Sequence, residues 1–283
     1  MSYPASSTVN HSAKFTSCQN CIKKADCPVA DCSAMQDRHS GGNQILSKQV
    51  QSGQTVFEAG QKFEGIHFIK SGFFKSYNID PNGVLQVTGF YFPGDFFGTD
   101  GIASGFYSDT VEALDTGSIC KVSLHTLLTQ INPNQLTPNR ENPGILSVVK
   151  VFSQIISHDR LLISSLGKMC AQRRFATFLL HVSSKMHGSG YFSDDFTLPM
   201  SRTDICNYLC LAIETISRLF TQFQVMGIID IDKRKLKILD MKLLQDLASD
   251  KQEEQVFRPQ QLATLRPNPA TKCQHLKNVE SRV

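Results

Sequence analysis

The spacing of hydrophobic and polar residues divides the chain into a β-rich part and an α-rich part. From residue 44 to about residue 115, short apolar and aromatic runs such as Phe73–Tyr77 and Gln86–Phe92 are separated by glycine-containing turns, which is typical of a barrel or roll. Asp80–Gly83 is a strong hairpin turn, because its proline presets φ and its glycine accepts a positive φ. We therefore predict a β-roll over residues 44–144.

A helical pattern follows the predicted roll. In Ile145–Leu166 the apolar residues lie three and four positions apart, so they form a broad stripe along one helix, which we place over residues 145–168. This stripe must be buried either against the roll of the same chain or against a second copy of the helix, and the pattern leaves both open. His158 and Asp159 lie on this helix, where they either face solvent or tune such a contact through their charge.

The pattern of residues 169–249 predicts a winged helix-turn-helix. A helix over Ala171–Met186 comes first. Ser201–Asp204 then resembles a capping box, in which a hydroxyl and a carboxylate satisfy each other's backbone N–H groups. A short helix runs to Leu209, and a longer helix, Ile213–Met226, follows after a tight turn.

Two short β-type runs after the longer helix, Ile228–Asp232 and Leu236–Leu239, form the predicted wing. The basic turn Lys233–Lys235 lies between them, and another short helix begins near Met241.

The longer helix has two different faces. Its core face consists of Ile216, Leu219, Phe220 and Phe223. Glu214, Ser217 and Arg218 lie at i, i+3 and i+4 near its N-terminus, the end that a recognition helix inserts into the major groove. Arginine pairs with guanine O6 and N7, glutamate accepts from cytosine N4, and serine does either. These three residues are therefore candidate DNA contacts, although any amphipathic surface helix has a polar face.

Composition narrows the class of protein. With 283 residues and 41% hydrophobic content, the chain is long enough for one large or two ordinary cores. A formal net charge of +4 permits a nucleic-acid partner without requiring one. The sequence lacks a run of apolar residues long enough to span a membrane and lacks a secretory signal, so we expect no membrane association and a cytoplasmic protein. Residues 1–43 are expected to form a flexible arm, and residues 250–283 a disordered tail.

The nine cysteines favour metal or redox chemistry over disulfides in a protein expected to be cytoplasmic. Cys18, Cys21 and Cys27 form a C-x2-C-x5-C motif, and Cys32 follows five residues later. Four nearby thiolates suit one tetrahedral zinc ion, whereas three suit an iron–sulfur cluster with a distant fourth ligand. The spacing does not decide between these alternatives. Partly buried helix positions are expected for Cys170 and Cys206.

Three groups of residues resemble the CRP/FNR family of bacterial transcription regulators, and specifically its oxygen-responsive FNR branch. They are the helix-turn-helix residues Asp204–Leu209 and Glu214–Leu219, the cysteines, and the roll motifs Gly53–Thr55, Ser71–Gly72, Thr88–Phe90 and Gly94–Asp95. The resemblance spans about Cys18–Ser249. It implies an α+β fold with an N-terminal β-roll (a cyclic-nucleotide-binding-like jelly roll), a long dimerisation helix and a C-terminal winged helix-turn-helix. It also implies a homodimer that binds double-stranded DNA and is not an enzyme.

The resemblance further implies roles for single residues. In the FNR branch Glu214, Ser217 and Arg218 match the residues that read the half-site of a TTGAT-type palindrome, whereas the catabolite-activator branch has an arginine where Ile213 stands. The first three cysteines of the branch and one at the end of the roll hold an oxygen-labile 4Fe–4S cluster, one per subunit. The matching metal ligands in this chain are Cys18, Cys21, Cys27 and Cys120, which leaves Cys32 as a spare or rival ligand.

The chain departs from the family pattern at several positions. Ala212 stands where a hydroxyl N-cap is usual, at a loss of roughly 1 kcal/mol of helix capping, and Cys210 stands where the turn usually has glycine. The residue pairs that bind a cyclic nucleotide in some relatives read Gly98–Thr99 and Ser108–Asp109 here. A phosphate would lack its arginine and would meet a carboxylate, so we expect no cyclic nucleotide.

The sequence thus predicts an oxygen-responsive transcription regulator in which the cluster controls dimerisation and DNA binding. RNA polymerase is a further expected partner, because family members touch it through the loop that matches Ile79–Gln86, although Val84 and Leu85 stand here where charge is expected. A zinc- or thiol-based redox regulator with the same DNA site is the alternative. An iron–sulfur electron carrier or enzyme is disfavoured, because the sequence has no second cluster motif, no nucleotide fingerprint and no evident catalytic pair.

Overall fold

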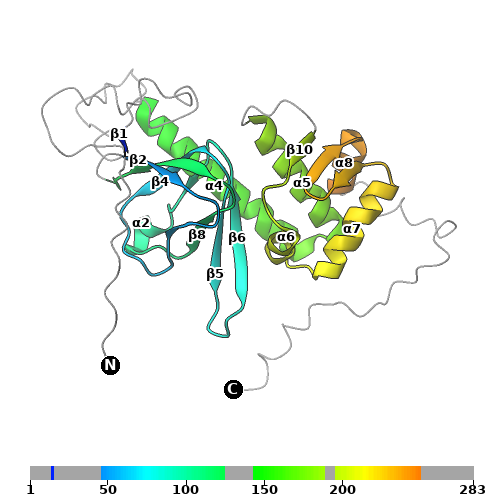
Figure 1. Cartoon of the computed structure of the whole chain (residues 1–283), viewed down its shortest axis with the longest axis horizontal. Helices are drawn as coiled ribbons and strands as arrows, with labels where there is room; N and C mark the ends of the chain where they lie inside the picture. The colour runs from blue at the N-terminus through cyan, green and yellow to red at the C-terminus, as the bar shows by residue number, and fades with distance from the viewer. Residues whose placement is uncertain (1–13, 16–45, 125–142, 189–194, 250–283) are drawn as a thin grey trace, which may run out of the picture.

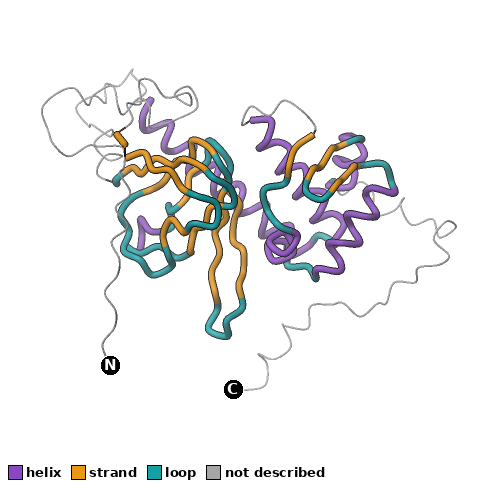
Figure 2. The backbone as a smooth tube through the Cα atoms, viewed as in Figure 1, coloured by secondary structure: helices purple, strands orange, loops and turns teal. Residues whose placement is uncertain are grey.

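The structure is a computed structural model that describes residues 14–15, 46–124, 143–188 and 195–249. Strands gather in an N-terminal roll and in a small C-terminal sheet, while helices connect and flank them (Figure 2). The predicted ligands Cys18, Cys21 and Cys27, the neighbouring Cys32 and the predicted tail lie outside the described residues. None of the described helices is both long and apolar enough to cross a membrane.

Two antiparallel sheets form the predicted roll (Figure 1). One sheet has the strand order β1-β2-β9-β4-β7, and the other has the order β3-β8-β5-β6. The elements are β1 (Lys14–Phe15), β2 (Leu46–Val50), β3 (Thr55–Phe57), β4 (Ile66–Ser71), β5 (Phe74–Ile79), β6 (Leu85–Tyr91), β7 (Phe96–Phe97), a short helix α2 (Gly101–Ser104), β8 (Thr110–Ala113) and β9 (Gly117–Val122).

The inner faces of the two sheets enclose an aromatic-rich core. It consists of Val50, Phe57, Ile69, Phe74, Phe97, Tyr107, Val111, Ala113 and Ile119. Successive side chains of a strand point to opposite faces of the sheet. Because Ile119 belongs to the core, the next residue of β9, Cys120, lies on the outer face of its sheet.

Strands β5 and β6 extend as a ribbon beyond the rest of the roll (Figure 1). At its tip Asp80 accepts hydrogen bonds from the backbone N–H groups of Asn82 and Val84, both at 2.8 Å, and Gly83 has a φ of 82°. These contacts confirm the predicted hairpin turn. Ile79 and Val84 flank the turn, and each is 61% exposed.

A long helix, α4 (Pro143–Lys168), follows the roll, as predicted (Figure 1). It begins two residues before the predicted start, because a proline suits the first turn of a helix. Leu162 packs against the C-terminal core and Ser165 is buried. Part of the α4 surface is therefore buried within the chain, but its apolar stripe is wider than that contact.

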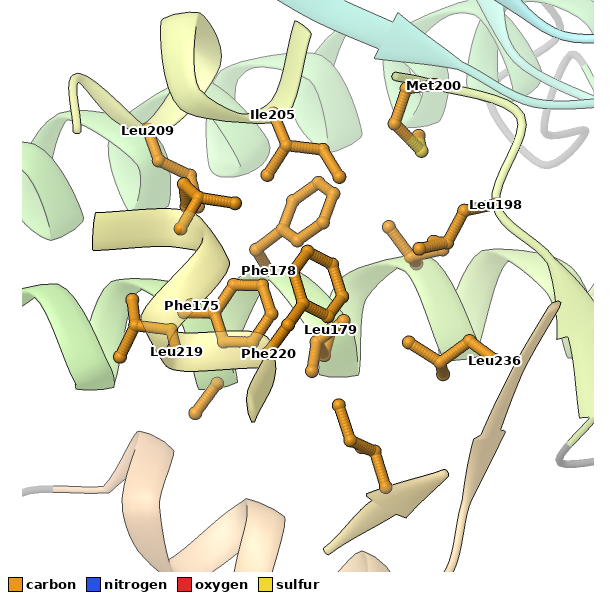
Figure 3. Packing of buried hydrophobic residues seen from close by; sticks show 14 of the residues in the cluster. Phe175, Phe178, Leu179, Leu198, Met200, Ile205, Leu209, Leu219, Phe220 and Leu236 are labelled. Carbon is orange, nitrogen blue, oxygen red and sulfur yellow. The ribbon is translucent and has the colours of Figure 1, made fainter. Parts of the chain in front are cut away.

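The C-terminal part is the predicted winged helix-turn-helix with one additional strand. Its elements are α5 (Ala171–Gly188), β10 (Asp195–Thr197), α6 (Arg202–Leu209), α7 (Ile213–Val225), β11 (Ile229–Asp232), β12 (Lys235–Ile238) and α8 (Met241–Ala248). Strand β10 pairs with β12 at the edge of the wing sheet, and its three residues carry too short a pattern to be predicted. In the core of this part, the rings of Phe175 and Phe220 pack with centroids 4.7 Å apart (Figure 3).

The helix-turn-helix also packs against the roll of its own chain. Lys75 of β5 donates to Asp204 of α6 at 2.9 Å, and the side-chain amide of Gln86 donates to the backbone oxygen of Asn207 at 2.6 Å. Both contacts join the β5–β6 ribbon to the first helix of the helix-turn-helix. The roll therefore helps to set the orientation of that helix.

Candidate nucleic-acid interface and cysteine ligand

The first helix of the helix-turn-helix begins with the predicted capping box. The backbone N–H of Asp204 donates to Ser201 Oγ at 3.0 Å, and the backbone N–H of Ser201 donates to Asp204 Oδ2 at 3.0 Å. Burial alone would raise the pKa of Asp204, but hydrogen bonds from Ser201 and Lys75 outweigh it and hold that pKa below its ordinary value. Asp204 therefore caps α6 and also joins it to the roll.

The turn between α6 and α7 holds Cys210 in the left-handed region, at φ 51° and ψ 49°. A residue with a Cβ pays roughly 1–2 kcal/mol for that conformation, which explains why glycine is usual at this position. The backbone at Cys210 is therefore strained, at a position where the sequence departs from the usual glycine. The backbone N–H of Leu211 donates to the oxygen of Cys206 at 2.9 Å and closes the turn.

The residue at the N-cap of α7, Ala212, makes no side-chain capping bond. This agrees with the missing hydroxyl noted in the sequence. The predicted core face is confirmed, because all four of its residues are buried. In particular, the rings of Phe220 and Phe223 pack against Phe175 of α5. These contacts determine which side of α7 turns outward.

The opposite side of α7 presents the predicted DNA contacts to solvent. Glu214 and Arg218 are exposed, and Ser217 between them is half-buried. Thr221 Oγ1 donates to the backbone oxygen of Ser217 at 3.2 Å, so it is partly engaged within the helix. The structure thus brings the three side chains onto one accessible surface. Their role as base contacts stays a prediction.

In the basic turn of the wing, Lys233–Lys235, two of the three side chains contact other parts of the protein. Arg234 donates from Nε to the backbone oxygen of Leu198 at 2.9 Å and from Nη2 to that of Pro199. Lys235 pairs with Asp195 at 3.2 Å. Lys233, at φ 54°, forms the tip. The sequence indicated a cluster of positive charge but not these contacts, because the strand that carries Asp195 was not predicted.

Arg202 of α6 is a further cation near α7, and its position was not predicted from the sequence. Its guanidinium lies 5.0 Å from the centroid of the Phe220 ring. Cation–π contacts of this kind hold a guanidinium in place while its edge stays accessible. No short-range sequence signal links these residues, because the contact joins two helices.

Cys120 is the one predicted metal ligand within the described residues. It is buried, and it lies opposite Ser47 of β2 and Phe68 of β4 in the ladder. Lys14 of β1 lies opposite Ser47 in turn. Lys14, Ser47 and Cys120 thus form a row across three neighbouring strands, so Lys14 lies roughly 10 Å from Cys120 at two strand spacings.

Two other cysteines have simpler positions. Cys206 is buried on α6 and donates from Sγ to the backbone oxygen of Thr203 at 3.1 Å, in agreement with the prediction. Burial raises the pKa of its thiol. Cys170 is exposed in the connection between α4 and α5, so the prediction of a partly buried helix position was wrong for it.

Two carboxylates lie at or next to the residue pairs that match the nucleotide-binding positions of some relatives. Asp109 accepts from Thr88 Oγ1 at 2.5 Å, and Asp100 accepts from the backbone N–H of Ser108 at 2.6 Å. Burial raises the pKa of Asp109, and the nearby Asp100 adds to this effect. The local electrostatics therefore oppose an anion.

Comparison with known proteins identifies both halves of the chain. Residues 173–247 match the Crp-like helix-turn-helix domain, and residues 47–134 match the cyclic nucleotide-binding domain. The fumarate and nitrate reduction regulatory protein of Escherichia coli K12 is 35% identical over 201 residues, which are 71% of this chain and 78% of that protein. The transcriptional activator protein FnrA of Stutzerimonas stutzeri is 32% identical over 199 residues, which are 68% of this chain and 76% of that protein.

The solved structure of FixK2 from Bradyrhizobium japonicum shares the fold, with a TM-score of 0.62 and 24% identity over 72% of this chain and 98% of that one. The curated relatives are transcription regulators rather than enzymes, as the sequence analysis expected. The exposed recognition helix thus belongs to a DNA-binding helix-turn-helix. With both domains matched and more than two thirds of these relatives covered, the chain belongs to the Crp/FNR family of transcription regulators.

Proposed function

We propose that this regulator controls transcription in response to oxygen, through a 4Fe–4S cluster held by Cys18, Cys21, Cys27 and Cys120, one cluster per subunit. The observation that supports it most is the strand row that joins residues 14–15, within the predicted arm, to Cys120. Only residues 16 and 17 separate β1 from Cys18. The cysteine motif therefore begins within reach of the one proposed ligand that lies on the roll.

The surroundings of Cys120 suit a soft metal ligand. Its thiol is buried on the outer face of the sheet, beside Phe68 and Ser47. Ser118, two residues away on the same strand, lies with its hydroxyl 3.4 Å from that of Ser47. Apolar cover and nearby hydroxyl groups are what tune a thiolate-bound cluster. When bound, an iron–sulfur cluster supplies a redox group that oxygen can reach and damage.

The open side of α4 supports a homodimer. Val149, Ile156 and Ile163 are spaced seven residues apart and are 55%, 51% and 70% exposed. Residues at heptad spacing line one side of a helix and pack against a second helix in a coiled coil. We infer that a second copy of α4 covers this line. The apolar stripe is then buried in both of the ways that the sequence left open. One side of the helix packs within its own chain, and the other side packs against a second copy.

A dimer presents two recognition helices to a palindrome whose half-sites lie about one turn of DNA, roughly 34 Å, apart. We propose that Glu214, Ser217 and Arg218 read a TTGAT-type half-site in the major groove of double-stranded DNA. Accordingly, we place the protein in the cytoplasm with its target. RNA polymerase is a proposed partner, and the exposed ribbon tip at Ile79 and Val84 is the surface offered to it.

We propose that a cyclic nucleotide is not the effector, although the roll matches the cyclic nucleotide-binding domain. Asp100 and Asp109 supply negative charge where a phosphate needs cations. Binding of a cyclic nucleotide at physiological concentration in calorimetry would contradict this part of the proposal.

The cluster is tested on protein purified without oxygen. Analysis should find about four irons and four sulfides per chain, and the visible absorption should be lost in air together with binding of a TTGAT palindrome by the same sample. Cys120→Ser should lack both properties, whereas Cys170→Ser, a change at an exposed cysteine, should keep them. Zinc without sulfide would support the zinc- or thiol-based regulator instead, and steady redox turnover would support an electron carrier.

A further inference from the structure

Three side chains meet where α4, α5 and α6 come together. The rings of His158 on α4 and His181 on α5 have centroids 4.5 Å apart, and the hydroxyl of Tyr208 on α6 lies 3.4 Å from His158 Nε2. Tyr208 is itself buried against Phe90 of the roll, with ring centroids 4.9 Å apart. His158 therefore does not simply face solvent. It joins the long helix to the first helix of the helix-turn-helix.

A cavity of about 30 Å³ lies beside these side chains and is lined by residues of the same three helices. That volume holds about one water molecule. Arg174, which lines it, donates to the backbone oxygens of Met169 and Leu209 and so has its charge turned toward carbonyl groups. The rings thus have beside them a small, mostly apolar space with a few polar groups in its lining, which gives room for a water molecule next to the imidazoles.

Charged groups around the two imidazoles come from α4, α5 and the roll. Asp159 lies 3.8 Å from His158 Nδ1, and Lys185 of α5 pairs with Asp95, which follows β6, at 2.5 Å. Burial, followed by His158 and Lys185, lowers the pKa of His181 to about 3. Burial also lowers the pKa of His158, and Asp159 only partly opposes this effect. The packed arrangement therefore favours the neutral form of both rings.

We propose that His158, His181 and Tyr208 form a pH-sensitive joint between α4 and the helix-turn-helix, which is closed when both imidazoles are neutral and loosens in acid, weakening DNA binding. The cause is linkage. An open joint exposes the imidazoles to water, where the pKa of histidine is about 6.5. Below that pH the open form binds protons that the closed form excludes, so each further pH unit favours opening by up to about tenfold per histidine.

The joint acts on DNA binding because α7 follows α6 after a single tight turn. Tyr208 lies near the end of α6, and Cys210 and Leu211 connect it to the recognition helix. When Tyr208 loses its contact with α4, the orientation of α7 relative to α4 is less restricted. This inference needs only the DNA-binding helix-turn-helix, and neither the cluster nor the half-site enters it.

Hydrogen exchange of the full chain tests the joint directly. Between about pH 7.5 and pH 5.5, protection of the amides around His158 and His181, corrected for intrinsic exchange rates, should fall about tenfold if one histidine titrates and up to about a hundredfold if both do. The double variant His158→Gln/His181→Gln should lose most of this pH dependence. His187→Gln is the control and should retain the pH dependence. His187 lies on α5 like His181, but its ring bonds to the backbone oxygen of Ser183 at 2.8 Å within that helix.

Affinity for a TTGAT palindrome, measured on the same proteins, should fall in acid more for the wild type than for the double variant. Equal loss of protection in both proteins would overturn the joint. If the double variant does not fold, the imidazole proton resonances of the wild type are followed against pH instead. Titration of His158 and His181 near the ordinary pKa of histidine, without loss of amide protection, would also overturn the joint. Absence of binding to this palindrome at neutral pH would contradict the proposed half-site, and the exchange result would still decide the joint.

Discussion

Arg218 and Glu214 lie one helical turn apart on the exposed side of α7, while the opposite side of the helix is buried. At the scale of single residues, this separation means that a change on the outer side leaves the core of the domain intact. The core holds the helix, and under the proposed function the exposed side chains give it a preference among DNA sequences. A recognition side chain is therefore tested by sequence preference, with stability as the check that the fold is unchanged.

We expect Arg218→Ala to weaken binding to the matching half-site by roughly 1–3 kcal/mol, because one forked pair of hydrogen bonds to guanine is lost. A gel-shift series over single-base variants of the site measures the effect. Arg218→Lys keeps the charge but loses the fork, so it should retain the salt dependence and lose the preference. An unchanged preference in both variants would show that Arg218 does not read a base.

At the scale of secondary-structure elements, α4 has one side packed within the chain and another side that is open. His158, Leu162 and Ser165 face the C-terminal part of the same chain, whereas Val149, Ile156 and Ile163 form an open apolar line. A line of large apolar side chains in water is costly to leave uncovered. The arrangement makes the proposed dimer contact and the observed contact with the helix-turn-helix separable by mutation.

A charge on the open line should therefore break the dimer without unfolding the chain. We expect Ile163→Glu to raise the dimer dissociation constant by at least about tenfold, because a carboxylate would be buried opposite its own copy. Sedimentation over a concentration series measures this. Gln154→Glu places the same charge on an exposed residue roughly on the opposite side of α4, and it should leave the dimer unchanged. Equal association of Ile163→Glu and wild type would rule out this seam.

At the scale of the whole molecule, the roll and the helix-turn-helix are joined through polar contacts of the β5–β6 ribbon. Lys75 is held between Asp204 at 2.9 Å and Glu112 at 3.7 Å, and its side chain is mostly shielded from water. A mostly shielded cation needs such partners. Asp204 is thus shared by a helix cap and a contact between the two halves of the chain.

We expect Asp204→Asn to lower the stability of the C-terminal part by on the order of 1–3 kcal/mol at neutral pH, since charged hydrogen bonds from Ser201 and Lys75 are lost. The pKa of Asp204 is lowered from 3.8, so its contribution is present above that pH and is lost as the pH falls through the folded value. The difference between wild type and variant in unfolding experiments should therefore shrink in strong acid. Asp230→Asn, at an exposed wing position, should show no such difference.

Much of this architecture was predictable because the signals are local. Ser201 and Asp204 specify the start of α6 through hydrogen bonds within one turn, and Asp80–Gly83 specifies a hairpin in the same way. The periodicity of α4 and α7 follows from burial of one side of a helix. By contrast, β10 has three residues and forms only because β12 offers an edge. The position of Cys170 was misjudged because the two helices stop on either side of it.

The sequence by itself determined most of the elements, their order and the chemistry of the candidate ligands, because capping, turn and periodicity signals act between residues a few positions apart. Only the tertiary structure decided which of these chemical groups meet. It placed Lys14 in line with Cys120, Lys75 against Asp204, and His158 against His181. These pairs are separated by many residues and depend on strand register and helix packing, which are determined by burial across the whole chain.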